Sequence, residues 1–514
     1  MNKALYVLIW RWHFFAGLYV VPFVLMLSVT GLVMLAGPWT DTYQYGDELM
    51  LVNAGIEPIE QSMAGLSMTE QPMAGVEKMS ADAQLAKVKG AYPHLQAAQY
   101  VPPISATQSS VFKMRGDNFA TTLVFVNPYN GAILGDFDSS DRWYSIADTI
   151  HGTLMLGKFG DVLIELSTGL TFLLLITGLY LYWPRPAFSL KALFKPSFLS
   201  QSNTTSRSYW KALHGSIGLY SLVFIVFFSL TGMAWTGIWG QQIVQPYSSF
   251  PTEKRASYWR SALPAANSER LTHGDLNDGQ LNQIPWGLEQ LPLPVSNTVN
   301  MGSLSNPHLA DPHASTQRVS LAAITQQGLD LGFALNAQAR FRIALPLRED
   351  GVYTLMSISS SRDVLDPSDD RTLHIDQYSA QVLADIGWDD YSLGAKTMAL
   401  GIPLHQGTMG WWNLVLAVIG CLFLIVLSVS GIIMWWQRKP ASYTSAASGY
   451  SSKLAAPIAQ ASMVQAAISE SEKVFILLCA LVAIIFPVTG GAMLLFSLIE
   501  WIARDKTGVK HERL

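Results

Sequence analysis

Four histidines give this chain its clearest capacity to bind a metal. His13 and His214 each precede an apolar run of membrane-span length, and His151 and His405 each precede another. Neutral imidazole is the commonest metal ligand in proteins, and an ionisable residue at a membrane helix is costly enough to indicate a function. One such histidine alone is more often a hydrogen-bonded interface residue, whereas two matched pairs favour metal ligation.

The segments around these histidines recur along the chain. A shift of 201 residues relates His13 to His214, and a shift of 254, falling to 253 further along, relates His151 to His405. The other matched features are Gly17 with Gly218, Thr30-Gly31 with Thr231-Gly232, and Thr177-Gly178 with Ser430-Gly431. Internal repeats indicate repeated structural units, so we expect two related halves.

The composition indicates an integral membrane protein. Half of the residues are hydrophobic and 14% are charged, against about 25% in soluble proteins. The net charge of -4 gives no sign of a nucleic-acid partner. Five apolar runs reach the length of about 20 residues that a span requires. Short loops rich in Lys and Arg stay in the cytoplasm, which places the N-terminus inside and two long segments outside. The tail is also basic, so the fifth run either spans the membrane or is re-entrant or interfacial.

Strand patterns occupy both long segments. Apolar alternation at 121–126 and 132–137 flanks the turn signal Asn127–Gly131, which predicts a hairpin, and 340–388 repeats the pattern. The expected fold is an integral membrane α-helical bundle of about five spans, in two repeated helix-pair halves, with two outer α+β domains. The predicted division is helix 1–36, outer domain 37–160, helix 161–184, cytoplasmic loop 185–212, helix 213–239, outer domain 240–404, helix 405–437, cytoplasmic loop 438–472, helix 473–500 and tail 501–514.

Membrane depth sorts the histidines into two sites. His13 and His214 begin their helices on the cytoplasmic side, whereas His151 and His405 lie at the outer starts of theirs. A span of about 23 residues at about 1.5 Å each is too long for one metal to bridge. Two facing imidazoles suit a six-coordinate heme iron, while zinc requires four ligands. Without a Cys-x-x-Cys-His sequence the heme is expected to be noncovalent, which gives two heme b groups.

Further residues are assigned around these sites. Gly17 and Gly218 remove side chains where a porphyrin edge would lie, and the candidate partners for its propionates are Arg11, Lys211 and Arg142. Ordinary interface charge is the alternative for these three cations. Asp161 and Glu165 are expected to be solvated at the membrane interface, with a proton relay as the alternative. His273 is expected to be an ordinary loop residue.

The electron donor and a possible copper site follow from two other segments. The cytoplasmic loops of about 30 residues are too short for a nucleotide-binding domain, so electrons must come from membrane quinol or from a separate cytoplasmic protein. A methionine-bearing stretch in the first outer segment suits Cu(I) or soft packing. Its members are Met63, Met68, Met73 and Met79.

The sequence resembles the PepSY-associated transmembrane proteins of the bacterial inner membrane. The resemblance covers most of the chain and rests on four motifs, which are Arg11-Trp12-His13-Phe14-Phe15-Ala16-Gly17-Leu18, Leu175-Ile176-Thr177-Gly178-Leu179-Tyr180-Leu181-Tyr182-Trp183-Pro184-Arg185, His405-x-Gly407-Thr408, and Leu345-Pro346-Leu347-Arg348 with Asp350-Gly351. It implies PepSY-like domains in the periplasm. The family includes di-heme reductases that release iron from ferric siderophores, with similar ligation by paired helix histidines. Several members have four spans rather than five.

Three functions are compatible with these features. The first is a ferric-siderophore reductase of the inner membrane, which passes electrons to a periplasmic chelate and releases Fe(II). The second is an electron conduit to another periplasmic acceptor, such as copper or a redox protein. The third is a non-enzymatic PepSY module that inhibits a peptidase or senses the state of the envelope, and it predicts no heme.

Overall fold

The computed structural model describes residues 3–52, 77–116, 120–182, 194–248, 271–277, 284–296, 317–437 and 470–506. It divides into two compact units. The first, here called the helix unit, comprises Met1–Leu32, Thr149–Val244 and Val415–Leu514. The second, the sheet unit, comprises Val33–Asp148 and Gln245–Leu414.

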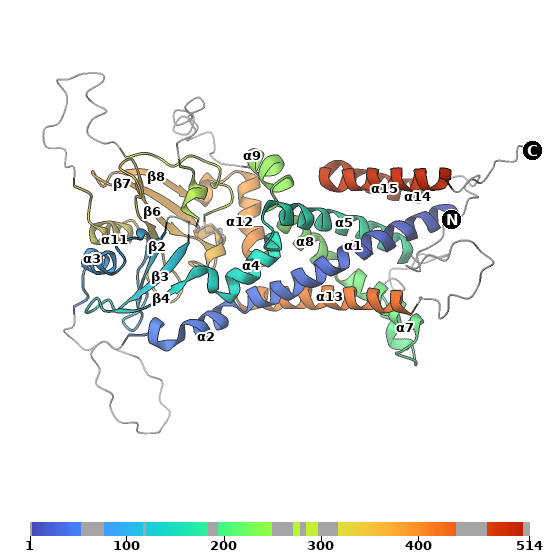
Figure 1. The fold of residues 1–514 in the computed structure, drawn as a ribbon, viewed down its shortest axis with the longest axis horizontal. Helices are drawn as coiled ribbons and strands as arrows, with labels where there is room; N and C mark the ends of the chain where they lie inside the picture. The colour runs from blue at the N-terminus through green and yellow to red at the C-terminus, as the bar shows by residue number, and fades with distance from the viewer. Residues whose placement is uncertain are drawn as a thin grey trace, which may run out of the picture. The chain divides into compact units, whose positions relative to one another are not determined.

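Three helices of the described chain are long and apolar enough to cross a membrane. They are α1 (Lys3–Leu35), α5 (Lys158–Tyr182) and α13 (Trp411–Trp436). A fourth span results if α7 (Arg207–Tyr220) and α8 (Leu222–Met233) are counted together, although they bend by 59° at their junction. The described residues therefore form a membrane protein with three to four candidate spans (Figure 1).

The fifth apolar run forms a broken helix. It consists of α14 (Glu470–Ile485) and α15 (Pro487–Lys506), and the apolar part of α15 ends at Ile499, short of a span. The break lies before Pro487, because proline cannot donate the backbone hydrogen bond that would continue α14. Both helices lie beside α5 (Figure 1), and the rings of Phe172 and Phe486 stack with centres 4.9 Å apart. Five spans are thus not confirmed.

Two shorter helices carry the histidines that were expected at the starts of spans. His151 lies in α4 (Trp143–Thr153), and His405 lies in the last turn of α12 (Leu393–Gln406). The chain turns between α4 and α5 through the left-handed residues Leu154 and Met155. Both histidines therefore lie in short helices that precede the spans, and His405 does not begin the span itself.

The sheet unit contains one antiparallel sheet of eight strands in the order β4-β3-β2-β1-β5-β6-β7-β8. Its strands are β1 (Gln96–Val101), β2 (Ser110–Arg115), β3 (Thr121–Val126), β4 (Ile133–Asp138), β5 (Arg342–Ala344), β6 (Val352–Ser357), β7 (Arg371–Asp376) and β8 (Val382–Gly387). The predicted hairpins β3–β4 and β7–β8 are confirmed. Two separate outer domains were expected, but β1 pairs with β5 and makes the sheet continuous. This pairing removes two open strand edges, which proteins otherwise have to protect.

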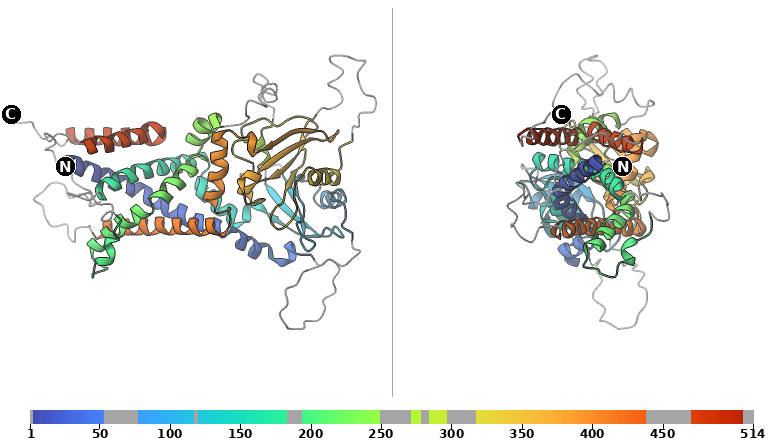
Figure 2. Two further views of the ribbon diagram at one scale, coloured as in Figure 1. Left: turned by 180° about the vertical axis from the view of Figure 1, so that it is seen from behind. Right: turned by 90° about the vertical axis from the view of Figure 1, so that its right-hand side faces the viewer.

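Helices cover one face of this sheet. The helices α3 (Ala81–Ala91) and α11 (Leu321–Asp330) lie next to each other there (Figure 2). Their apolar residues pack with Phe112, Phe341 and Leu355, which are fully buried. The other helical elements are α2 (Gly37–Met50), α9 (Gln245–Ser248), a π-helical turn at Trp239–Val244, and 3-10 turns at Ser139–Asp141, Ser197–Ser200, His273–Leu276, Ser359–Ser361, Pro367–Asp369 and Trp388–Asp390.

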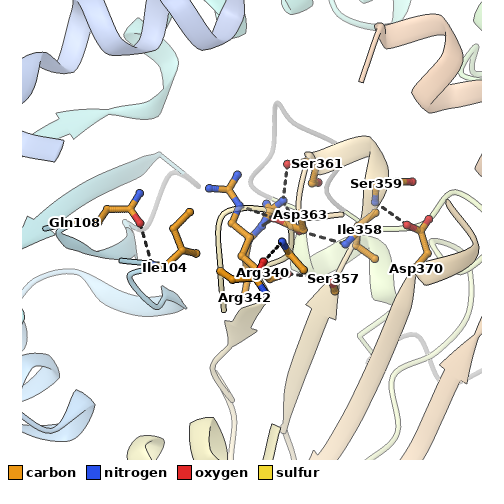
Figure 3. A network of polar contacts seen from close by, with 12 residues as sticks. Ile104, Gln108, Arg340, Arg342, Ser357, Ile358, Ser359, Ser361, Asp363 and Asp370 are labelled. Atoms are coloured by element: carbon orange, nitrogen blue, oxygen red, sulfur yellow. Dashed lines mark hydrogen bonds and ion pairs between the residues drawn. The ribbon is translucent and has the colours of Figure 1, made fainter. Parts of the chain in front are cut away.

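A buried aspartate ties the loop after β6 to the sheet. The Asp363 side chain is fully buried and accepts hydrogen bonds from Arg340 at 3.0 Å and from Arg342 at 3.1 and 2.8 Å (Figure 3). It also accepts the backbone N–H of Ile358 at 3.3 Å. Buried charges are tolerated when they are paired and hydrogen-bonded in this way.

Some predicted features fall outside the described residues. They include Met63, Met68 and Met73 of the methionine-bearing stretch, residues 185–193 and 438–469 of the two predicted cytoplasmic loops, and residues 507–514 of the tail.

Candidate metal centre

His13 and His214 face each other within the helix unit. His13 lies on α1 and His214 on α7, both half-buried. The centres of the two imidazole rings are 6.4 Å apart, and the ring planes are nearly perpendicular at 88°. The structure therefore brings together the pair that the sequence predicted.

A threonine hydroxyl fixes the protonation of the His13 ring. His13 Nδ1 lies 2.9 Å from Thr177 Oγ1 on α5, and that hydroxyl donates its only proton to the carbonyl of Leu173 at 2.7 Å. The oxygen must then accept at the histidine, so Nδ1 carries the ring proton. The lone pair of Nε2 is left available, which is the form in which histidine binds a metal.

His214 has the same arrangement on a different pair of helices. Its Nδ1 lies 3.0 Å from Ser430 Oγ and 3.1 Å from the carbonyl oxygen of Leu427, both on α13. The Ser430 hydroxyl donates to Leu427 at 2.9 Å. Both neighbours therefore accept, Nδ1 again carries the proton, and Nε2 is again the basic nitrogen. No hydrogen-bond partner for either Nε2 is found among the described residues.

The distance between the rings matches two ligands on opposite sides of one metal ion. A metal–imidazole bond is about 2.0–2.1 Å long, and a ring nitrogen lies about 1.1 Å from its ring centre, so two axial imidazoles have centres about 6.2–6.4 Å apart. The 6.4 Å found here falls at the end of that range. Two neutral imidazoles directly hydrogen-bonded to each other would be closer.

The glycine after each hydroxyl residue lies against the histidine ring, most tightly at Gly178. A Cβ on Gly178 would lie 3.2 Å from His13 Cε1, and one on Gly431 would lie 3.5 Å from His214 Cε1. The sequence shows these Thr-Gly and Ser-Gly pairs, but they are also typical of close helix packing in membranes. Their role as supports for histidines was missed because it depends on which helices face each other.

His151 is held by a third pair of the same kind. Its Nδ1 lies 2.9 Å from Thr30 Oγ1 on α1, which donates to the carbonyl of Met26 at 2.9 Å. A Cβ on Gly31 would lie 3.9 Å from His151 Cε1. His405 is half-buried and belongs to the sheet unit.

The two glycines predicted to adjoin a cofactor each lie beside one leucine side chain. A Cβ on Gly17 would meet only Leu174, at 3.8 Å, and one on Gly218 only Leu427, at 3.5 Å. Both are ordinary contact distances. The role of these two glycines beside a cofactor therefore stays a prediction.

The three cations predicted near the cofactor have different surroundings. Arg142 binds Asp41 at 2.5 Å and lies over the ring of Tyr144 in the sheet unit, so it already has a carboxylate partner. Arg11 lies over the ring of Phe15, and Lys211 is exposed.

The protein ligands present limit the kind of metal group. Among the described residues, no cluster of three or more His, Cys, Asp or Glu could hold a metal ion. A metal between His13 and His214 would therefore need its other ligands from a non-protein group. A porphyrin, which supplies four nitrogens in a plane and leaves two axial positions, matches this donor set.

Comparison with known proteins assigns the chain to a family. Residues 10–438 match the PepSY-associated TM region. The chain belongs to this family. The match contains all four predicted histidines and ends before α14 and α15. Among curated proteins, none matches the chain.

A buried histidine pair in the sheet unit of this family member was not expected. His273 and His374 are both fully buried, with their Nε2 atoms 2.9 Å apart. His273 Nδ1 donates to the carbonyl of Leu291 at 2.8 Å, so its Nε2 must accept from His374. His374 Nδ1 then accepts from the Thr354 hydroxyl at 2.9 Å. Every ring nitrogen therefore has a hydrogen-bond partner, and adding a proton to either ring would break one of these hydrogen bonds.

The histidine pair predicts a pH-dependent stability. Burial lowers the pKa of His273 to about 4 and that of His374 further. Between pH 6.5 and about 4 the unfolded chain binds more protons than the folded chain, so acidification costs about 3 kcal/mol at His273, and His374 adds a loss of the same sign. Burial raises the pKa of Glu289 and Asp370 to about 7, so these carboxyls favour folding on acidification.

Replacing both histidines isolates their contribution to the pH dependence of stability. As the pH falls from 6.5 to about 4, the Tm of the His273→Gln/His374→Gln double variant should rise relative to that of the wild type. Thermal unfolding of the purified protein measures this, with the exposed His94→Gln as the control that follows the wild type. A constant difference in Tm would contradict the assignment.

Proposed function

We propose that this protein is a di-heme b reductase of the bacterial inner membrane. It passes electrons across the membrane to a ferric siderophore in the periplasm, where reduction releases the iron as Fe(II). The lipid bilayer surrounds its helix unit, and membrane quinol or a cytoplasmic protein is the electron donor. His13 with His214, and His151 with His405, are the proposed axial ligands of the two hemes.

One observation carries this proposal. His13 and His214 present two basic Nε2 atoms at the ring separation of axial ligands, within a unit made of membrane helices. A structural histidine pair in a membrane would be expected to use its nitrogens in hydrogen bonds to each other or to neighbours. The pair His273–His374 does so, and its ring centres are only 4.9 Å apart.

The chain's own residues hold and orient the cofactor. Thr177 and Ser430 keep Nδ1 protonated and so keep Nε2 basic, which strengthens a metal bond and fixes the ring plane. A heme held by both histidines would supply one-electron transfer. Arg11, Lys211 and Arg142 remain the proposed propionate partners.

Reduction suits the chemistry of iron release. A siderophore holds Fe(III) through hard oxygen donors, and Fe(II) is a softer ion of lower charge that such donors bind less tightly. Each ferric chelate takes one electron, so one quinol supplies two chelates and gives up two protons. The protein therefore has to manage protons as well as electrons if quinol is its donor.

The experiment that tests the proposal is a difference spectrum of the purified protein, reduced minus oxidised, with a pyridine hemochrome count. We expect two heme b per chain, and oxidation of the reduced protein on adding a ferric siderophore. If a copper complex or redox protein oxidises it and ferric chelates do not, the protein is an electron conduit to another acceptor. A colourless protein from heme-replete cells would leave the non-enzymatic PepSY module.

A further inference from the structure

Glu165 is a carboxyl group buried among the membrane helices. It lies two turns into α5 and is 1% exposed. Its Oε2 accepts the backbone N–H groups of Ile238 at 3.1 Å and Trp239 at 3.2 Å. Its Oε1 is also buried and has no hydrogen-bond partner among the described residues. The expectation that this side chain is solvated at the membrane interface is wrong.

The contacts of Glu165 suit both of its charge states. The two N–H groups stabilise the ionised carboxylate. The carboxylate in turn satisfies these two backbone donors, which need an acceptor within a membrane. This capping role uses only one oxygen. The other oxygen is buried without a donor, which is costly for a full negative charge, and it is the position where a proton can be held.

Asp161 connects Glu165 with the start of α5. It lies one turn earlier on the same helix face, is half-buried, and accepts the backbone N–H of Gly237 at 2.9 Å. The residues just before it, 155–159, are exposed. Carboxyl groups thus follow one face of α5 from an exposed end to a fully buried position.

Thr489 extends this polar line further along α5. A Cβ on Gly169, one turn beyond Glu165, would overlap the Thr489 hydroxyl. Thr489 is fully buried, and its Oγ1 also has no partner among the described residues. Glu165 and Gly169 are about 6 Å apart along the helix. Two buried polar atoms without partners, one on α5 and one on α15 beside it, call for an explanation, and a proton at Glu165 or a bound water would supply one.

We propose that Glu165 is a proton-binding site within the membrane helices, reached from the start of α5 through Asp161, and filled when the protein accepts an electron. The proton comes from water at that end of α5, forms the O–H bond at Oε1, and returns when the electron leaves. Opposite charges attract strongly in a medium of low dielectric constant, so an added electron favours uptake of a proton nearby. This electron-linked step rests on the proposed function, whereas the proton site rests on the contacts above.

The first test measures the heme midpoint potentials of the purified holoprotein as a function of pH. In the wild type, at least one potential should fall as the pH rises, and in Glu165→Gln this dependence should disappear. Glutamine keeps an oxygen for the N–H groups, so a heme count of two shows that the variant is folded. The control is Glu472→Gln, which removes another buried carboxyl of the helix unit, one already bonded to Tyr180, and it should keep the wild-type dependence.

The second test does not require heme. A hydrophobic carbodiimide reacts with protonated carboxyl groups in membranes, and mass spectrometry should find its adduct on Glu165, with less adduct as the pH rises. The proposal is overturned if Glu165→Gln keeps the wild-type dependence of the potentials, or if Glu165 is unlabelled at every pH. A colourless protein would end the electron-linked step, and labelling alone would then decide the proton site.

Discussion

Replacing His13 with alanine is expected to reduce the heme content of the purified protein from two per chain to about one. The variant removes one of the two proposed axial ligands, whose ring centres are 6.4 Å apart. The remaining ligand, His214, would hold the heme from one side only. A pyridine hemochrome count and the reduced-minus-oxidised spectrum measure the loss.

The double variant gives the sharper result. If His13 and His214 bind the same heme, the His13→Ala/His214→Ala variant should lose no more heme than either single variant, because residues of one site are not additive. If they belong to different hemes, the double variant should lose both. That second outcome, or two hemes and an unchanged spectrum in His13→Ala, would refute the assigned pair.

Thr177 offers a graded version of the same experiment. Valine has the shape of threonine but cannot accept the Nδ1–H of His13, and the loss of such a supporting bond typically lowers metal affinity by about 10–100-fold. Thr177→Val should therefore lose heme on dilution or competition while retaining it at high concentration. Thr177→Ser keeps the hydroxyl and should behave like the wild type. The exposed His94→Ala should retain both hemes.

Much of this site can be predicted from the sequence, because its histidines recur in matched sequence surroundings. The sequence shows the supporting threonine and serine residues, but their contacts with the histidines could not be predicted. Thr177, for example, lies 164 positions from His13 in the sequence. Nothing in the sequence showed that α4 is a separate helix, because the turn that follows it uses left-handed Leu154 and Met155 rather than glycine. Helix pairing and strained turns are set by tertiary contacts, which local patterns do not record.

The order of strands in the sheet also depends on contacts between distant segments of the sequence. Its hairpins follow from turn residues and alternation, which act over a few positions. The joining of β1 to β5 pairs Tyr100 with Ile343, and no local pattern specifies a partner so distant in sequence. The sequence also could not predict which charged residues are buried. Arginine and aspartate form both the exposed pair Arg348–Asp350 and the buried cluster around Asp363.

Replacing Asp363 with alanine is expected to destabilise the sheet unit by about 3–5 kcal/mol. The change leaves Arg342, whose side chain is 10% exposed, and Arg340 without their shared carboxylate. It also removes the acceptor for the backbone N–H of Ile358. An unpaired buried charge costs more than the lost attraction alone, because the Arg342 guanidinium has already given up most of its water. Denaturant unfolding of the purified protein measures the effect.

Asp350 provides the matched control for this prediction. It pairs with Arg348 at 3.0 Å, but both side chains are nearly half exposed, and such surface pairs contribute about 0–1 kcal/mol. Asp350→Ala should therefore unfold almost as the wild type does. The heme proposed at His13 and His214 should survive in both variants under native conditions, because both histidines belong to the helix unit. Equal losses of stability in the two variants would show that burial of Asp363 does not govern its contribution.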